Sequence, residues 1–110
     1  MKPLTLAMLL LVSIVLFTTT ALSYTPFVQI RYRLNNDGVV WVEIYRDANG
    51  SELIKRICTQ ETQTAGPHIV QWDGTNTQNT QVSNGYYYCW IVFEYNTTTQ
   101  TKMQKIEYSH

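Results

Sequence analysis

An alternation of apolar and polar residues with period two recurs along this chain and restricts its fold more than any other feature. In segment 28–34 the apolar side chains fall on one face and the polar ones on the other, and segment 39–46 repeats the pattern with Val40, Val42 and Ile44. Turns rich in Asn, Asp and Gly separate such segments. The pattern predicts an all-β chain folded as an antiparallel β-sandwich.

Six segments have the length and composition of strands, namely residues 28–34, 39–46, 51–59, 68–72, 86–95 and 102–109. The first two are expected to pair with each other across the Asn-Asn-Asp-Gly turn. Segment 86–95 is the most apolar and is expected to lie centrally in a sheet. The polar stretches 60–67 and 96–101 are interpreted as a loop and a hairpin tip.

The first residues have the pattern of an export signal. Lys2 precedes an apolar run, and Ala21 and Ser23 supply small residues for cleavage before Tyr24. Residues 1–23 are therefore predicted to be a signal peptide and residues 24–110 one domain, secreted to the periplasm or the cell surface. The alternative is a retained hydrophobic anchor, because residues 4–22 nearly reach the length of a membrane span. Membrane contact is expected only through this segment.

Two cysteines, Cys58 and Cys89, follow this segment. A small exported domain buries little apolar surface and meets an oxidising compartment, so we expect one disulfide between them. Two buried thiols are the alternative. Asn49 and Asn96 each begin a glycosylation acceptor triplet, which matters only in a source that glycosylates.

Four pieces of the sequence agree in type and order with a known family. They are IRYRL, VVWVEIYRDANGSEL, AGPHIVQWDGTN and NGYYYCWI, and they resemble the immunoglobulin-like domain of the flagellar hook-capping protein family, which also recurs near the C-termini of secreted bacterial proteins. The resemblance implies an immunoglobulin-like or fibronectin-III-like sandwich with a structural role. Asn79 stands where the family commonly has Gly, and Asn also tolerates the left-handed backbone. The family's filament-binding region has no counterpart here, so a flagellar role is not expected.

The Trp-Asp-Gly turn is interpreted as structural. Trp72 shares a face with His68 and Val70, so its ring is expected in the core, while the Asp73 carboxylate caps the following turn. The same structural role is assigned to five residues, Trp72, Asp73, Gly74, Gly85 and Tyr87.

Catalytic chemistry is poorly represented in this sequence. It contains no nucleophile elbow, phosphate loop or metal-ligand spacing, and Asp73 and Glu94 lack neighbours that would define an acid and base pair. We therefore expect no enzyme, no cofactor and no metal; a calcium site after Asp73 is disfavoured because segment 73–84 carries one charge. Eight basic and eight acidic residues cancel, which argues against a nucleic-acid partner.

Aromatic residues are the remaining functional signal. Trp41 and Tyr45 share the outward face of one predicted strand, and a second strand carries Tyr86, Tyr88 and Trp90 on one face. If both faces belong to one sheet, they form a binding surface; otherwise the rings complete a core or an oligomer contact. The first hypothesis is a non-catalytic structural or adhesion module that binds proteins or itself. The alternative is a small carbohydrate-binding module.

Overall fold

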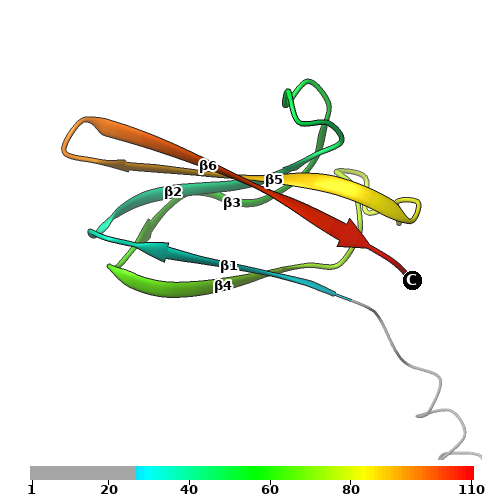
Figure 1. Cartoon of the computed structure of the whole chain (residues 1–110), viewed down its shortest axis with the longest axis horizontal. Coiled ribbons are helices and arrows are strands. Elements are labelled where there is room, and N and C mark those ends of the chain that lie inside the picture. Colours follow the sequence, from blue (N-terminus) through cyan, green and yellow to red (C-terminus); the bar gives the residue numbers. More distant parts are fainter. Residues whose placement is uncertain (1–26) are drawn as a thin grey trace, which may run out of the picture.

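The computed structural model describes residues 27–110, which form six strands in two facing sheets (Figure 1). The strands are β1 (Val28–Leu34), β2 (Gly38–Tyr45), β3 (Leu53–Gln63), β4 (Gly66–Trp72), β5 (Gly85–Tyr95) and β6 (Thr98–Tyr108). Every pairing within the sheets is antiparallel. The predicted fold class, an antiparallel immunoglobulin-like β-sandwich, is confirmed.

The strands divide unequally between the sheets. One sheet contains β1 and β4, and the other has the order β3-β2-β5-β6. Strand β5 lies between β2 and β6, as its apolar sequence predicted. The predicted pairing of the first two strands is wrong, because β1 pairs with β4 across the sandwich from β2. The turn between Leu34 and Gly38 carries the chain from one sheet to the other.

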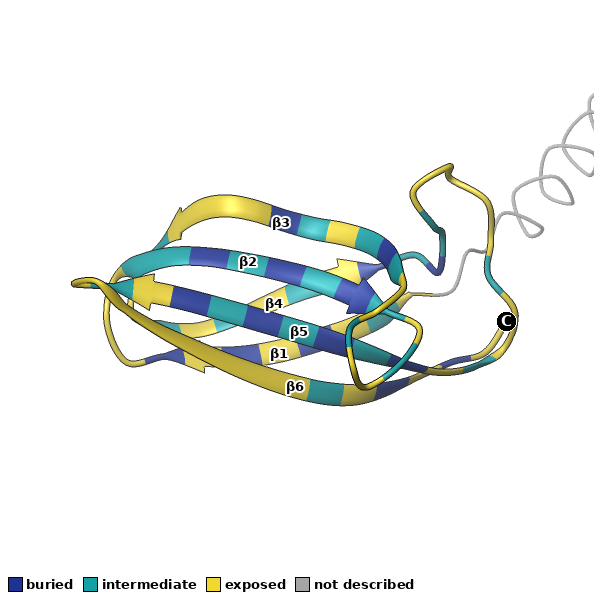
Figure 2. Ribbon diagram, turned by 90° about the horizontal axis from the view of Figure 1, so that it is seen from above, coloured by how far each residue is buried: buried dark blue, intermediate teal, exposed yellow. Residues whose placement is uncertain are grey.

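The core lies between the inner faces of the two sheets. Buried and partly buried residues alternate along β2 and β5, as Figure 2 shows by colour. On β2 the side chains of Val40, Val42 and Ile44 have no exposed surface. On β1 the buried positions are Ile30, Tyr32 and Leu34, again two residues apart. The period-two pattern therefore identifies the buried face of both strands.

Strand β3 departs from simple alternation. Its register against β2 shifts between Val40 and Val42 and again beside Glu43 and Ile44, so Arg56 pairs with Glu43 on the outer face. Gln60 has a φ of 51°, in the left-handed region. These bulges allow both Ile54 and Cys58 to be buried while Arg56, midway between them, is exposed. The stretch predicted as a loop, 60–67, instead contains the end of β3 and the start of β4.

The hairpin between β5 and β6 is shorter than its polar sequence suggested. Only Asn96 and Thr97 separate the two strands, and both have positive φ values, 47° and 62°. This combination is that of a two-residue type I′ turn, whose twist matches that of the flanking strands. The residues from Thr98 to Gln104 are thus strand, although nearly all of them are exposed.

The predicted signal peptide, residues 1–23, lies outside the described residues, as does the alternative of a retained anchor. Within residues 27–110 there is no helix with the length and hydropathy of a membrane span.

Candidate interaction face on the four-stranded sheet

The aromatic residues singled out in the sequence lie on one face. Strand β2 pairs with β5, with Tyr45 opposite Tyr88 and Glu43 opposite Trp90. Residues directly opposite each other in antiparallel strands point to the same side of the sheet. The side that faces away from β1 and β4 therefore carries all five predicted binding residues, Trp41, Tyr45, Tyr86, Tyr88 and Trp90. We call this set the outer aromatic face.

The centre of the outer aromatic face is ordered by polar contacts. The Tyr45 and Trp90 rings meet edge to face with their centroids 6.1 Å apart. The Tyr45 hydroxyl donates to Glu43 Oε1 at 2.9 Å, and Arg56 Nε donates to Glu43 Oε2 at 2.9 Å. The pKa of the Tyr45 phenol is raised, first by burial and then by the hydrogen bond and the charge of Glu43. The phenol therefore stays protonated and can donate a hydrogen bond.

The end of the outer aromatic face near Tyr86 is open to solvent. Tyr86 is 57% exposed and Met103, opposite Trp90 on β6, is 45% exposed. The Lys105 ammonium lies 4.4 Å from the centroid of the Tyr86 ring, within the range of a cation–π contact. Exposed aromatic and Met side chains are typical of protein-binding surfaces.

A hollow of about 190 Å³ lies beside Trp90. The loop between β2 and β3 forms one wall, and Asp47 holds this loop by accepting hydrogen bonds from the backbone and hydroxyl of Ser51. Asn49, Glu43 and Tyr45 line the remainder with polar groups. The buried Trp90 Nε1 has no hydrogen-bond partner among the described residues. An unpaired buried donor is costly to the fold.

Sequence reasoning missed four residues of this surface. Glu43 alternates with Trp41 and Tyr45 and could have been assigned to the same face from the period alone. Asn49 comes from a loop, and Met103 and Lys105 depend on the register of β6 against β5. Exposed polar strands such as β6 carry no hydrophobic pattern from which that register could be derived.

The residues predicted to be structural surround one end of the core. Trp72 and Tyr87 have no exposed surface, and their rings meet edge to face at 5.2 Å. Trp72 Nε1 donates to the Thr75 carbonyl at 2.9 Å. Gly74 (φ 79°) lies against the Tyr108 ring, and Gly85 (φ 151°) begins β5. Buried rings joined by a polar bond to the next turn anchor that turn to the core.

The segment after Asp73 is organised by side-chain caps. Asp73 Oδ1 accepts from the Thr75 backbone N–H at 3.0 Å and from the Thr75 hydroxyl at 2.6 Å. Asn79 has a φ of 61°, so it adopts the left-handed backbone predicted for it. Three loop oxygens surround the Lys55 ammonium at 2.9–3.1 Å, from Thr75, Asn76 and Asn79. These contacts hold the loop after Asp73 against β3, the strand that carries Lys55.

Asp73→Asn is expected to lower stability in a pH-dependent manner. Hydrogen bonds from Thr75 lower the pKa of the Asp73 carboxyl below its ordinary value. A lowered folded-state pKa stabilises the fold above the unfolded pKa, about 3.9, and this contribution is lost as the pH falls through the folded pKa. We expect a deficit of less than about 1 kcal/mol at pH 7, because the carboxylate is partly exposed.

Urea unfolding at neutral and acidic pH measures this deficit. Asn keeps an acceptor for the Thr75 N–H, so the comparison isolates the charge. The deficit should decrease as the pH falls below about 3.9 and the Asp73 carboxyl becomes protonated in the folded protein. A deficit that is the same at both pH values would contradict the argument.

The predicted disulfide is wrong. Cys58 and Cys89 are both buried free thiols. Cys58 lies opposite Val42, and Cys89 lies opposite Ile44 on the other side of β2. Two strand spacings separate β3 from β5 by roughly 10 Å, which exceeds the Cα separation of about 7 Å that a disulfide spans. Both cysteines are buried, which agrees with the alternative of two buried thiols.

Native protein is expected to resist thiol alkylation. Burial raises the pKa of Cys89 to about 12 and that of Cys58 to about 11, where the charge of Glu61 adds to the effect. The thiolate is the reactive species, so labelling by iodoacetamide should be about 100-fold slower or more than for a free cysteine. Intact mass should show two adducts in denaturant without reductant. Absence of adducts there would show that a disulfide exists after all.

No group of three or more His, Cys, Asp and Glu side chains within residues 27–110 is arranged to hold a metal ion. The chemistry that the outer aromatic face supports is recognition through ring contacts and a few polar groups.

Comparisons with known proteins agree with this architecture. The FlgD Ig-like domain family matches residues 27–95, from just before β1 to the end of β5. No curated protein matches the chain significantly.

Among solved structures, the crystal structure of FLGD from P. aeruginosa has a similar fold, with a TM-score of 0.61 and 23% sequence identity. The similarity covers 73% of this chain and 58% of that one, so the chain spans less than two thirds of that protein's length. The family match extends over well over half of the residues, and the resemblance inferred from the sequence motifs is confirmed. The chain therefore belongs to the FlgD Ig-like domain family.

Proposed function

We propose that this protein is a secreted, non-catalytic structural or adhesion module that binds other proteins, or further copies of itself, at the cell surface. Membership of the FlgD Ig-like domain family supports a structural role. The N-terminal export pattern supports secretion.

The outer aromatic face is the observation that carries this proposal. Five aromatic residues share the outer side of the four-stranded sheet, and the two-stranded sheet covers only the inner side. A two-layer sandwich buries one face of each sheet, so rings on the other face are not needed for the core. Tyr86 and Met103 expose much of their apolar surface. Large exposed aromatic and Met side chains are enriched at protein interfaces.

A second candidate, carbohydrate binding, is favoured by the hollow beside Trp90. An indole, a carboxylate and an amide line this hollow, contributed by Trp90, Glu43 and Asn49. Aromatic faces stack on sugar rings, and such polar groups bond to sugar hydroxyls.

The double variant Tyr86→Ser, Met103→Ser is expected to lose self-association. Both side chains are exposed, so the fold should be retained while the association constant falls by about tenfold or more. Ile69→Ser is the matched control, because Ile69 is 53% exposed on β4, in the other sheet. Sedimentation equilibrium over a range of concentrations measures the effect.

The outcome separates the two candidate functions. An equal loss in both variants would contradict a role for the outer aromatic face. Retention on cellulose or chitin by a protein that stays monomeric would favour the carbohydrate candidate, and Trp90→Ala should then abolish that retention.

A further inference from the structure

Strand β1 has a free edge that faces β6. Within residues 27–110, β1 pairs with β4 alone and β6 pairs with β5 alone. Gln104 Nε2 donates to the Arg31 carbonyl at 2.8 Å, which shows that the backbone groups of Arg31 point away from β4. Backbone direction alternates along a strand, so Gln29 and Arg33 present their N–H and C=O groups on the same side. This free edge can accept another strand.

The inner face of β6 changes character along its length. Ile106 and Tyr108, near the C-terminus, point inward and are buried. Gln100 and Lys102 lie opposite Phe93 and Ile91 and so point to the same side, yet both are exposed. Strand β6 is thus covered at one end and open at the other, where the two-stranded sheet does not reach it.

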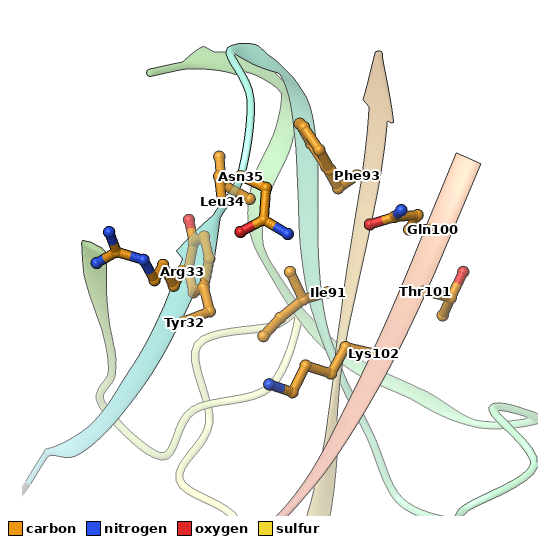
Figure 3. Close-up of a pocket in the computed structure, with 9 residues that line it drawn as sticks. All are labelled: Tyr32, Arg33, Leu34, Asn35, Ile91, Phe93, Gln100, Thr101 and Lys102. Atoms are coloured by element: carbon orange, nitrogen blue, oxygen red, sulfur yellow. The ribbon is translucent and has the colours of Figure 1, made fainter. Parts of the chain in front are cut away.

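A groove of about 510 Å³ occupies this open region (Figure 3). Leu34, Ile91 and Phe93 provide its apolar part, β1 forms one wall and β6 the other. Figure 3 shows the Lys102 amine extending from β6 toward β1. We call this region the edge groove.

The edge groove is positively charged through Lys102. None of the described residues lining it is acidic, and Arg33, at its rim, directs its guanidinium away from it (Figure 3). A cation without a counter-charge favours an anionic occupant. The class of occupant follows from the apolar residues in the groove and from the free backbone groups of Arg33. Only a polypeptide strand supplies both apolar side chains and regularly spaced backbone donors and acceptors.

We propose that the edge groove binds a short, extended, acidic peptide segment of another protein, which adds to the free edge of β1 as a third strand. On the side of the segment that faces the four-stranded sheet, an apolar side chain contacts Phe93 and a carboxylate two residues away pairs with Lys102. The Gln104 to Arg31 bond limits the segment to the end of β1 from Tyr32 to Leu34 and the following Asn35, about four residues of the partner. This inference rests on the proposed function in one respect, since it names a partner class for a protein-binding module.

Fluorescence anisotropy with labelled synthetic peptides tests the proposal. The probe is a peptide of about seven residues, Val-Thr-Glu-Thr-Val-Thr-Glu, in which Val and Glu alternate on one face of the strand and Thr occupies the other. The first comparison peptide has Lys in place of Glu. The second keeps the Glu and Val side chains but carries N-methyl groups on alternate backbone nitrogens, which removes the donors needed for strand pairing.

The full chain is expected to bind the acidic peptide at least about tenfold more tightly than either comparison peptide. Lys102→Glu should weaken binding of the acidic peptide by about tenfold or more. Lys105→Glu is the matched control, because Lys105 is exposed on the same strand but points to the outer aromatic face. Its affinity for the peptide should be unchanged.

Several results would overturn the proposal. The acidic peptide would fail to bind, the Lys and Glu peptides would bind with equal affinity, or the two lysine variants would lose affinity for the acidic peptide equally. Binding that appears only after removal of the residues before Phe27 would assign the groove to the chain's own N-terminal segment. A dimer that Lys102→Glu dissociates would assign it to a second copy.

The double variant Tyr86→Ser, Met103→Ser separates this proposal from the proposed function. The altered residues lie on the outer aromatic face, so peptide binding in the edge groove should persist in this variant. Peptide binding without self-association would support the edge groove as a peptide site and contradict the role of the outer aromatic face. Self-association without peptide binding would support the outer aromatic face and contradict the peptide site.

Discussion

Replacing Trp72 by alanine is expected to leave most of the protein unfolded at room temperature. The Trp72 side chain has no exposed surface and packs between the rings of Tyr87 and Tyr108, whose centroids lie 5.2 and 5.4 Å away. Truncation also removes the donor to the Thr75 carbonyl. A buried Trp replaced by Ala typically costs about 3–5 kcal/mol, which approaches the whole stability of a domain of this size.

Thermal unfolding followed by circular dichroism measures this effect. Trp41→Ala is the matched control, because Trp41 lies on the outer aromatic face and is only partly buried. The control should keep a cooperative transition with a smaller decrease in its midpoint. An unchanged midpoint for Trp72→Ala would contradict the role of this ring in the core.

Gly74→Ala is expected to destabilise the fold by about 2–5 kcal/mol. Gly74 has a φ of 79°, and a left-handed conformation costs an alanine about 1–2 kcal/mol. The added Cβ would also overlap the Tyr108 ring. That ring is 1% exposed and packs against Trp72, so it cannot move without disturbing the core. Forced overpacking of this kind adds about 1–3 kcal/mol.

Gly50→Ala separates the two contributions to this cost. Gly50 has a similar φ, 71°, but its added Cβ would make an ordinary contact with the Trp90 ring at 3.6 Å. The Gly50→Ala variant should therefore show only the cost of placing an alanine in the left-handed conformation. The difference between the two variants in urea-derived free energy of unfolding measures the overlap with Tyr108. Equal destabilisation would show that the Tyr108 ring moves aside at no cost.

The outer aromatic face shows how far sequence reasoning reaches. The period-two pattern placed Trp41 and Tyr45 on one face of their strand, and Tyr88 and Trp90 on one face of theirs. Whether the two faces coincide depended on which strands pair. The register between β2 and β5 joins them, with Tyr45 opposite Tyr88.

The disulfide shows where the same reasoning fails. Cys58 and Cys89 were expected to form a disulfide, and both are buried free thiols. Their pairing required β3 and β5 to be neighbours, but β2 lies between them. The period also placed Arg56 on the same face as Cys58, whereas irregular register on β3 turns Arg56 outward to Glu43. A bulge inserts one extra residue into a strand, so side chains beyond it point to the opposite face from the one that simple alternation predicts.

The edge groove was not predicted at all. Its lining comes from β1, β5 and β6, and the exposed polar stretch of β6 was interpreted partly as a hairpin tip. Only the unequal division of strands between the two sheets leaves the β1 edge free and the adjoining part of β6 uncovered.

The sequence by itself determined the central part of each strand, the buried faces of β1, β2 and β5, and the turn chemistry around Trp72 and Asp73, because these depend on local backbone preference and on side-chain hydrophobicity. Only the tertiary structure decided which strands are neighbours, where β3 bulges, and which edges remain free. Every strand presents the same backbone donors and acceptors, so alternation identifies the apolar face of a strand but not its partner. That choice is made by packing between residues far apart in the chain, such as Trp72 against Tyr108.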